Sequence, residues 1–374
     1  MIGDVTYISM KIAIIAHSHY PVAQPFSGGL AAHTYYLTKR LMALGHDVTL
    51  FAPYGTDKDL PYQPICMPGV EGSAKPDTTL IGKNEQAYSR LMKMLQHSDF
   101  DIIHNNSLHH APLAMAEDMP MPVITVLHTP PSDVMLSGLS DIADAPNHYL
   151  IAVSHKIASV WQKHLQYIKP KVIYNGIDTA LWKPKAALFK NNYIAWSGRI
   201  TEEKGTHYAI EAANLSNMRL KICGPIHDER YFSDVIHPMI ESSENIEYCG
   251  NLHGDALVHI IAKARAFVCT PCWEEAFGLV IAEALSCGVP IAGFSRGALP
   301  EILDASVSTL VHQDSCALSQ AISRSISLSR THCRNYAYER FSLDSMVEGY
   351  EMLYYEARNK PALIISHLQH RLNG

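Results

Sequence analysis

The sequence lacks a stretch that could span a membrane. A spanning helix needs about 20 mainly apolar residues, and the apolar runs of this chain are shorter and are interrupted by polar residues. The start of the chain has an acid at Asp4 and only a short apolar run over 12–16, which predicts a buried strand and no signal peptide. We therefore expect a soluble, cytoplasmic protein.

The sequence also lacks an excess of basic charge. The 36 Asp and Glu residues outnumber the 30 Lys and Arg residues, which gives a formal net charge of −6. A protein dedicated to nucleic acid usually carries a basic field, so we expect no nucleic-acid partner. A predicted helix around Trp161 carries four lysines, at Lys156, Lys163, Lys169 and Lys171. This pattern predicts a solvated helix face or, at most, a peripheral contact with anionic lipid.

The eight cysteines lack the regular spacing of a disulfide framework. Such a pattern is typical of a protein in a reducing compartment. Cys269 and Cys272 form one Cys-x-x-Cys, but neither a second pair nor a spaced histidine cluster accompanies it. We expect these two cysteines to be structural, and metal or redox chemistry is the alternative. The 21 histidines show no convincing metal-ligand spacing either, so no metal site is predicted.

The Gly-x-Gly-x-x-Gly fingerprint of dinucleotide-binding proteins is missing, which disfavours a dehydrogenase. The nearest segment is Ser27-Gly28-Gly29, which follows the first predicted strand and opens a helix. Glycine lets the backbone approach an anion closely, and the unpaired amides of a helix start can hold a phosphate. A bare turn is the alternative, and the local sequence does not decide between the two.

The sequence does contain a regular alternation of short apolar runs and helix-period segments. This alternation is typical of parallel sheets covered by helices, so the predicted class is α/β. Because one core rarely organises more than about 300 residues, 374 residues predict two domains. We predict open α/β domains over 1–174 and 191–345, a linker over 175–190, and a helical segment over 346–374 that can return to the first domain. Such sheets bind ligands at the carboxyl ends of their strands, so the expected site is a cleft across which the domains face each other.

The individual elements are predicted from the same alternation. The predicted strands are 11–16, 47–51, 101–104, 123–127 and 149–153 in the first domain, and 193–197, 219–223, 246–248, 266–270 and 290–294 in the second. A helix is predicted over 30–44, where Gly45 supplies the stop, and another over 341–372, where Pro361 breaks the pattern. The segments 61–79 and 130–144 are expected to be variable loops.

A basic turn follows the first predicted strand of the second domain. Gly198-Arg199 and Lys204-Gly205 place an arginine and a lysine five residues apart. The planar fork of an arginine and the point charge of a lysine can converge on a diphosphate. The alternative is a solvated basic loop, partly neutralised by Glu202 and Glu203.

Two carboxylates eight residues apart mark the segment Trp273–Pro290. Glu275 precedes Gly278, at the predicted start of a helix, and Glu283 lies within that helix. Both carboxylates can face the strand ends, where each could accept hydrogen bonds from the paired hydroxyls of a ribose or hexose. A charge-assisted bond of this kind contributes about 1.5 to 3 kcal/mol. The alternative is a helix-capping carboxylate together with an exposed helical glutamate.

Taken together, these motifs resemble those of glycosyltransferase family 4, whose retaining enzymes share the GT-B fold of two Rossmann-like domains. The likeness runs from about Lys11 to about Tyr354. It comprises, in order, Gly28-Gly29, His33, Gly45-His46-Asp47-Val48, Asn175-Gly176-Ile177-Asp178, Gly198-Arg199, Lys204-Gly205, Cys223-Gly224 and the Glu-x7-Glu motif of Glu275 and Glu283. Each match is modest alone, but their order and spacing are specific. One departure is Arg296-Gly297, where family members often have two glycines close to the donor sugar.

The resemblance implies a donor site for a UDP-, GDP- or ADP-linked sugar. Arg199 and Lys204 would hold the diphosphate. Glu283 would bind the ribose, Glu275 would bind the donor sugar, and His128 would shape the site of the reacting sugar. The other donor-binding residues that the resemblance implies are Gly28, Gly29, Gly198, Gly224, Leu252, Ala276, Phe277, Gly278 and Leu279. Of these residues, His128, Arg199, Lys204 and Glu275 are assigned to catalysis, and we further expect His17 and His33 to line the acceptor cleft.

The resemblance further implies transfer of a hexose with retention of anomeric configuration, in which the leaving phosphate helps to accept the acceptor proton. Negative charge builds up on that phosphate, so a cation must stabilise it. We expect Arg199 and Lys204 to do so without a metal ion or other cofactor, and we therefore expect activity in chelator. The expected acceptor is a saccharide or a glycolipid. A nucleotide-sugar epimerase of the same fold and a non-catalytic nucleotide-sugar-binding protein are the alternatives, and the oligomeric state stays open.

Overall fold

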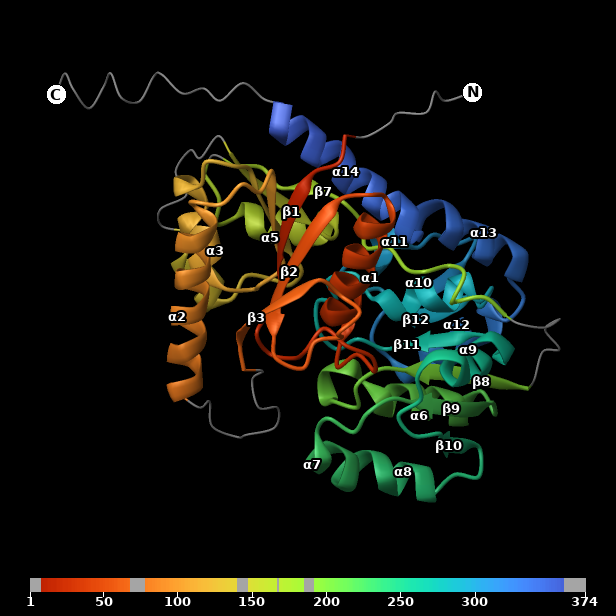
Figure 1. The fold of residues 1–374 in the computed structure, drawn as a ribbon. Helices are drawn as coiled ribbons and strands as arrows, with labels where there is room; N and C mark the ends of the chain where they lie inside the picture. Colours follow the sequence, from red (N-terminus) through yellow and green to blue (C-terminus); the bar gives the residue numbers. More distant parts are fainter. Residues whose placement is uncertain (1–7, 68–77, 140–146, 167, 185–191, 360–374) are drawn as a thin grey trace, which may run out of the picture. The chain divides into compact units, whose positions relative to one another are not determined.

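The computed structural model describes residues 8–67, 78–139, 147–166, 168–184 and 192–359. They form two compact units (Figure 1). Of the described residues, unit 1 comprises those within Met1–Val153, Ile157–Ile173 and Val347–Gly374, and unit 2 comprises those within Ser154–Lys156 and Tyr174–Met346. Each unit is built on one parallel sheet, which confirms the predicted α/β class.

The sheet of unit 1 has seven strands in the order β3-β2-β1-β4-β5-β6-β7. Their bounds are β1 Lys11–Ile15, β2 Asp47–Pro53, β3 Tyr62–Cys66, β4 Ile102–Asn105, β5 Val123–Leu127, β6 His148–Ala152 and β7 Lys171–Val172. The central strands β4 and β5 are buried along their whole length. Strands buried on both faces read as continuous apolar runs, which is why the sequence located β1, β2, β4, β5 and β6 to within two residues.

The two edge strands of unit 1 were not predicted. β3 lies in the segment 61–79, so the expectation of a loop is wrong for Tyr62–Cys66. Most side chains of β3 are exposed or half-buried, and Pro64 interrupts it, so it shows no apolar run. β7 has only two residues. The other expected loop contains a short helix, α4 (Asp133–Ser137), and its residues 140–144, like residues 68–77 of the first, lie outside the described part.

The remaining helices of unit 1 are α1 Gly29–Ala43, α2 Thr78–Leu95, α3 His110–Ala114 with the 3-10 turn Met115–Asp118, and most of α5 His155–Gln162. α5 is shorter than the sequence predicted and ends before Lys163. Its Trp161 is 1% exposed, and the indole N–H donates to the Thr129 carbonyl at 2.8 Å. The tryptophan is therefore a core residue of unit 1 and is not available to a lipid surface.

The last described helix, α14 (Leu343–Asn359), belongs to unit 1 from Val347 onwards. There the Tyr354 hydroxyl donates to His104 Nδ1 at 2.6 Å, and Glu351 Oε1 lies 3.0 Å from His46 Nε2. All four side chains are buried. These polar contacts fasten α14 to the strands and loops of unit 1. Pro361, the predicted breaker, lies outside the described residues.

The sheet of unit 2 has six strands in the order β10-β9-β8-β11-β12-β13. Their bounds are β8 Tyr193–Ser197, β9 Arg219–Cys223, β10 Ile246–Tyr248, β11 Phe267–Cys269, β12 Ile291–Phe294 and β13 Ser308–Val311. β8 lies in the middle and pairs in parallel with both β9 and β11. The loops that follow these three strands therefore emerge side by side at one edge of the sheet.

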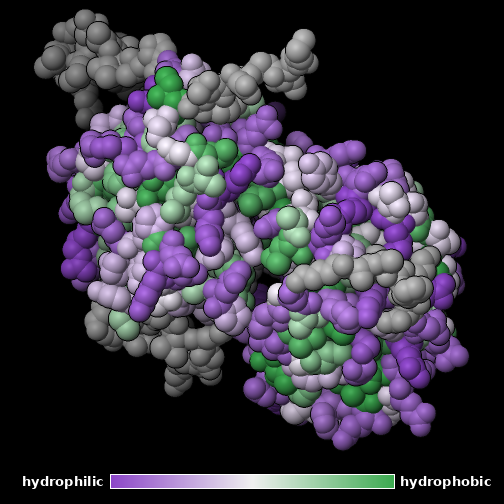
Figure 2. All heavy atoms as spheres, turned by 45° about the vertical axis from the view of Figure 1, so that its right-hand side comes forward, coloured by the Kyte–Doolittle hydropathy of each residue, from purple (hydrophilic) through white to green (hydrophobic). Residues whose placement is uncertain are grey.

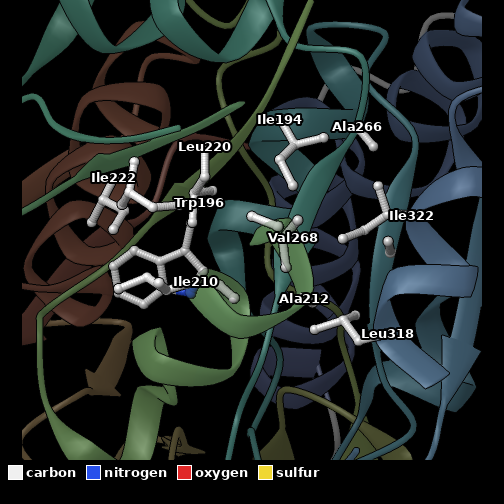
Figure 3. Packing of buried hydrophobic residues seen from close by; sticks show 14 of the residues in the cluster. Ile194, Trp196, Ile210, Ala212, Leu220, Ile222, Ala266, Val268, Leu318 and Ile322 are labelled. Carbon is white, nitrogen blue, oxygen red and sulfur yellow. The ribbon is translucent and has the colours of Figure 1, made fainter. Parts of the chain in front are cut away.

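A buried apolar cluster holds this sheet in place (Figure 3). Ile194 and Trp196 come from β8, Leu220 and Ile222 from β9, and Val268 from β11. The Trp196 indole N–H donates to Thr270 Oγ1 at 3.0 Å, just beyond the end of β11. The core thus extends to the strand ends and positions the loops that follow them.

The helices of unit 2 alternate with these strands along the chain, and the last two, α12 and α13, follow β13 (Figure 1). They are α6 Thr206–Leu215, α7 Glu229–Tyr231, α8 His237–Glu241, α9 Gly254–Lys263, α10 Leu279–Ser286, α11 Leu299–Ile302, α12 Ser315–Ser325 and α13 Arg330–Phe341, with a 3-10 turn at Glu202–Lys204 and a π-helical turn at Phe232–Ile236. Within the described ranges, every helix is too short or too polar to cross a bilayer. On the face that Figure 2 shows, hydrophobic residues occur in small groups among hydrophilic ones.

Candidate functional site

The loop after β8 is pressed against the end of β11. Gly205 has φ +65°, and a Cβ at this position would lie 2.2 Å from the Thr270 carbonyl oxygen. Only glycine therefore permits this close approach. The Thr270 hydroxyl donates to the Lys204 carbonyl at 3.0 Å, which fixes the backbone that carries the lysine side chain.

The Lys204 side chain meets Glu275 in unit 2. The Lys204 ammonium lies 2.6 Å from Glu275 Oε2, and the two side chains are 22% and 12% exposed. The Trp273 indole N–H donates to the same oxygen at 3.1 Å, and the ammonium lies 4.9 Å from the Trp273 ring centroid. A cation, a carboxylate and an aromatic face are thus brought together by the ends of β8 and β11.

A small cavity of about 50 Å³ opens beside this ion pair. Its lining includes Gly198, Lys204, Thr270, Glu275 and Val280. The cavity therefore joins Gly198 and Lys204, from the loop after β8, with Glu275, which is distant in the sequence. A larger cavity of about 370 Å³ in the same unit has a different lining, which includes Glu202, His207, Asp228 and Tyr231.

Gly297 fixes the backbone of Glu275 from the other side. A Cβ on Gly297 would lie 2.3 Å from both the backbone N and O of Glu275, and the Ala298 amide donates to that oxygen at 2.8 Å. The neighbouring Arg296 guanidinium lies 3.7 Å from Glu274 and hydrogen-bonds to Gln313. The family departure at this position thus places a cation beside Glu274, next to the residue predicted to bind the donor sugar.

Helix α10 begins at the predicted glycine. Gly278 has φ +85°, a conformation that L side chains rarely adopt, and it precedes the first helical residue, Leu279. Ala276 and Phe277 are buried, so their backbone and not their side chains would meet a ligand. Glu283 lies one turn into α10 and is partly buried. Burial raises the pKa of its carboxyl group to about 8.

Arg199 lies in the loop after β8, and Gly224, which follows β9, packs against the start of that loop. The Arg199 side chain is 36% exposed, and its Nη2 lies 3.4 Å from Glu203, outside the lining of the cavity that contains Lys204. Gly224 packs directly on Gly198, because a Cβ on Gly224 would lie 1.9 Å from the Gly198 carbonyl oxygen. The Gly224 amide donates to the Gly250 carbonyl at 3.0 Å, and the Leu252 amide donates to that oxygen at 3.1 Å. The backbones of Gly198, Gly224, Gly250 and Leu252 therefore lie against one another.

In unit 1, Gly28 and Gly29 mark the start of α1. Gly28 is extended, with φ −179°, and a Cβ there would meet nothing within 4 Å among the described residues. The space beside this helix start is therefore open to an anion.

His17, after β1, is 3% exposed, and its Nδ1 accepts a hydrogen bond from the His19 amide at 3.2 Å. Burial, and to a smaller extent His19, lower the pKa of His17 to about 4.

His128 lies directly after β5 and is buried. The Asn106 amide donates through Nδ2 to Thr34 Oγ1 at 3.3 Å, so its oxygen faces His128 Nε2 at 2.8 Å. Nε2 of His128 therefore carries a proton in the neutral ring. Burial lowers the pKa of His128 well below its usual value, and His33, His104 and His17 lower it further. The ring is thus neutral near pH 7.

Asn106 is the site residue that sequence reasoning missed. It lies one residue beyond β4, in the run Asn105-Asn106-Ser107. Polar residues at the carboxyl end of a strand are a usable signal of a binding site.

His33 is 2% exposed, and its ring centroid lies 4.8 Å from that of His128. The structure therefore places His33 in the buried histidine cluster of unit 1. Its predicted role at the acceptor stays a prediction.

The chain contains two Asp-x-Asp triplets, 57–59 and 99–101, of the kind that holds a metal ion in metal-dependent transferases. Both lie in unit 1. Asp99 pairs with Lys11, and Asp101 lies 3.1 Å from Arg358. Asp57 accepts a hydrogen bond from the Asp59 amide at 3.0 Å. These aspartates therefore serve local contacts, while Lys204 lies in unit 2.

Two family models match consecutive parts of the chain. Residues 27–181 match the model described as Glycosyltransferase Family 4, and residues 178–340 match the one described as Glycosyl transferases group 1. The chain belongs to glycosyltransferase family 4. The resemblance seen in the sequence is thereby confirmed, and the enzyme is a hexosyltransferase that uses a nucleotide sugar.

Curated relatives of this glycosyltransferase include several sugar-transferring enzymes. A glycogen synthase of Mycobacterium tuberculosis is 26% identical over 341 residues, which covers 78% of this chain and 80% of the relative. A phosphatidyl-myo-inositol mannosyltransferase of Propionibacterium freudenreichii is 23% identical over 349 residues, with 85% and 87% covered. These relatives span most of both chains, so the likeness is not confined to one unit.

Solved structures show the same fold. The sucrose-phosphate synthase of Thermosynechococcus elongatus superposes with a TM-score of 0.76 at 18% identity, over 93% of the glycosyltransferase and 98% of that chain. HepE of Anabaena in complex with UDP and glucose gives a TM-score of 0.72 at 18% identity, over 93% and 100%. The predicted GT-B fold is therefore confirmed.

Proposed function

We propose that this glycosyltransferase transfers a hexose from a nucleoside-diphosphate sugar to a saccharide or glycolipid acceptor, with retention and without a metal ion. The contact between Lys204 and Glu275 is the observation that carries the proposal. It combines, beside one cavity, a cation for the leaving phosphate and a carboxylate for sugar hydroxyls. Both are needed at the point where the donor's glycosidic bond breaks.

Lys204 and Arg199 would stabilise the leaving diphosphate. The Lys204 ammonium is held beside the cavity by Glu275 and lies over the Trp273 ring, so it is at the site before the donor arrives and needs only to turn from Glu275 to the phosphate. A charge already held at the site costs little reorganisation as negative charge develops on the leaving phosphate. Arg199 is more exposed and must turn away from Glu203 to reach the same phosphate. Lys204 is therefore proposed as the main electrostatic catalyst and Arg199 as an auxiliary clamp.

The two glutamates of the motif would bind different hydroxyls. Glu275 is proposed to accept hydrogen bonds from the donor sugar once Lys204 turns to the phosphate. Glu283, whose pKa burial raises to about 8, is proposed to bind the ribose. A ribose diol brings two donors into this partly buried site, and they stabilise the charged carboxylate. Nucleotide binding is then expected to release a proton from Glu283 near pH 7.

His128, Gly28 and Gly29 belong to unit 1, and their part in the reaction is proposed from the family likeness. The neutral His128 ring can donate or accept a hydrogen bond at the reacting sugar. It is not proposed as a general base, since the leaving phosphate can accept the acceptor proton. The amides at Gly28 and Gly29 would assist at the diphosphate.

The names of relatives support the choice of donor and acceptor classes. One relative is named a glycogen synthase and another a phosphatidyl-myo-inositol mannosyltransferase, which favours saccharide and glycolipid acceptors. A structural neighbour holds UDP and glucose, so a UDP-hexose is the first donor to test. GDP and ADP sugars are the next candidates.

A calorimetric titration with UDP, GDP and ADP in excess EDTA tests the donor site. One nucleotide should bind the native protein, and Lys204→Ala should weaken that binding at least tenfold. Lys263→Ala, which removes a partly exposed lysine that contacts His259 on α9, is the matched control and should bind normally. If binding vanishes in EDTA and returns with magnesium, the metal-free assignment is wrong.

Product analysis then separates transfer from the alternatives. Incubation with the nucleotide sugar and a panel of saccharide and glycolipid acceptors should give an α-linked product from an α-linked donor. An epimerised nucleotide sugar formed without acceptor would replace the transferase proposal by an epimerase. Inverted anomeric configuration would overturn the retaining mechanism.

A further inference from the structure

Two cysteines in unit 2 lie side by side at the end of the sheet, although they are far apart in the sequence. Cys223 is the last residue of β9, and Cys249 follows the last residue of β10. The parallel register pairs Ile222 with Tyr248, so the next residues along both strands are Cys223 and Cys249. The Cys249 amide donates to the Ile222 carbonyl at 2.8 Å, which continues the ladder to this point.

Side chains at matching positions of neighbouring strands extend from the same face of the sheet. Adjacent strands are about 4.8 Å apart, and a disulfide accepts Cα separations of about 4.4 to 6.8 Å. The interaction between the two thiols shifts the pKa of both, down for Cys249 and up for Cys223. The two side chains are thus neighbours on one face of the sheet, and a small approach of the two strand ends would bring their sulfurs to bonding distance.

The two thiols differ in access and in acidity. Cys223 is 1% exposed, whereas Cys249 is partly exposed. The interaction with the Cys223 thiol is the largest of the effects that lower the pKa of Cys249; the Lys221 ammonium adds to it, while burial and Glu247 oppose it. The same interaction and burial raise the pKa of Cys223. An accessible thiol that ionises readily beside a buried partner is the arrangement of a redox-sensitive cysteine pair.

We propose that Cys223 and Cys249 form a peroxide-sensitive dithiol that closes to a disulfide. The Cys249 thiolate attacks one oxygen of hydrogen peroxide, the O–O bond breaks, and hydroxide leaves, which oxidises the sulfur to a sulfenic acid. The hydroxide takes up the proton that the Cys249 thiol released. The Cys223 sulfur then attacks the Cys249 sulfur, the S–O bond breaks, and water leaves with the Cys223 proton. One peroxide is thus reduced to two waters, and two thiols are oxidised to one disulfide.

The cross-link would reach the proposed donor site through two glycines. Gly224 follows Cys223 and packs so tightly on Gly198 that no Cβ would fit between them. Gly250 follows Cys249, and its carbonyl accepts from the Gly224 amide at 3.0 Å. Pulling the two sulfurs together must shift one or both of these loops. This coupling rests on the proposed function, and we expect the oxidised enzyme to bind its nucleotide about tenfold more weakly.

Peptide mapping of the full-length protein tests the pair directly. The reduced protein is treated with hydrogen peroxide, its remaining thiols are alkylated, and it is digested with trypsin. Cleavage after Lys221, Arg230 and Lys263 places each cysteine on its own peptide, 222–230 and 231–263. We expect a linked pair of these peptides in wild type and in Cys316→Ser, which removes an exposed cysteine elsewhere, and none in Cys249→Ser. Unlinked peptides, or Cys249 found only as sulfinic or sulfonic acid, would overturn the proposal.

Nucleotide titration of the same samples tests the coupling. The tenfold loss should appear only in oxidised protein that carries the link, and dithiothreitol should reverse it. A complete link with unchanged affinity would overturn the coupling to the donor site. If the reduced protein binds no nucleotide, the proposed function fails, while the linked peptides still report on the dithiol. Because the wild type alone shows the link, the result does not depend on a cysteine variant folding.

Discussion

The Lys204 ammonium and the Glu275 carboxylate lie 2.6 Å apart, although 71 residues separate them in the chain. In the free site the two charges are paired. Under the proposed function, a diphosphate would draw Lys204 away from Glu275, and the released carboxylate would then be available to sugar hydroxyls. Donor binding would thus exchange one ion pair for two interactions with the substrate.

Trp273 is the residue that should hold Glu275 in place during this exchange. Trp273→Phe keeps an aromatic ring under Lys204 but removes the indole N–H that donates to Glu275. A hydrogen bond to a charged group contributes about 1.5 to 3 kcal/mol. We therefore expect kcat to fall by roughly ten- to a hundredfold, with nucleotide affinity nearly unchanged. Steady-state kinetics and a UDP titration measure the two separately.

The control for Trp273→Phe is the same substitution at another tryptophan, Trp182. Trp182 is buried in the same unit, where its carbonyl accepts a hydrogen bond from Ser286 on α10, and Trp182→Phe should reduce stability without a selective loss of kcat. If Trp273→Phe weakens nucleotide binding as strongly as it lowers kcat, Trp273 acts on Lys204 and not on Glu275.

Gly205 should tolerate no side chain. Gly205→Ala would place a Cβ 2.2 Å from the Thr270 carbonyl oxygen at φ +65°. Gly254→Ala has a similar φ of +53° but meets nothing within 4 Å among the described residues. The left-handed conformation alone costs about 1 to 2 kcal/mol, so Gly254→Ala should lose about that much stability and Gly205→Ala clearly more. Urea unfolding measures both, and equal losses would show that the loop after β8 moves freely from β11.

Glu283 should make stability depend on pH. Burial raises its pKa in the folded state to about 8, above the value near 4.3 of an exposed glutamate. Between these values the folded state binds more protons than the unfolded state, so stability falls as pH rises from about 5 to about 8. Glu283→Gln removes this cost. Its melting temperature should exceed that of wild type by a margin that grows over this range and then levels off.

An exposed glutamate provides the control for Glu283. Glu339→Gln changes the net charge equally at an exposed position of α13, and its margin over wild type should stay flat between pH 5 and 8. A flat margin for Glu283→Gln as well would show that Glu283 is ionised in the free enzyme at neutral pH.

Asn106 should act as a positioning residue for His128. Asn106→Asp puts a carboxylate where the amide oxygen now accepts from His128 Nε2. An adjacent negative charge favours the imidazolium form, so the pKa of His128 should rise from its lowered value. Because His128 would then become protonated at a higher pH, we expect the acid limb of the pH–kcat profile to shift to higher pH than in wild type. Asn106→Ala should instead lower kcat about tenfold at every pH. If Asn106 had only a structural role, Asn106→Asp would leave the acid limb of the profile where it is in wild type.

The apolar strands could be predicted because a buried strand consists largely of consecutive apolar residues. β5, β8 and β9 have the bounds that the sequence predicted, since a strand buried between helices needs an apolar run. The short edge strand β10 was also predicted, although only its Ile246 is buried. The edge strand β3 could not be predicted, because one side of it faces solvent and the apolar signal disappears. Strand order is not encoded in the run of residues at all. The sequence could not show that β8 lies between β9 and β11.

The sequence by itself determined which chemical groups this glycosyltransferase carries. The Glu-x7-Glu spacing, the Arg199 and Lys204 turn and the paired glycines are local patterns, and each depends on the geometry of one loop or helix. Only the tertiary structure decided which groups meet. It brought Lys204 to Glu275, Asn106 to His128 and Cys223 to Cys249 through strand pairings that join distant segments. Such contacts depend on packing of the whole sheet, and no short stretch of residues contains that information.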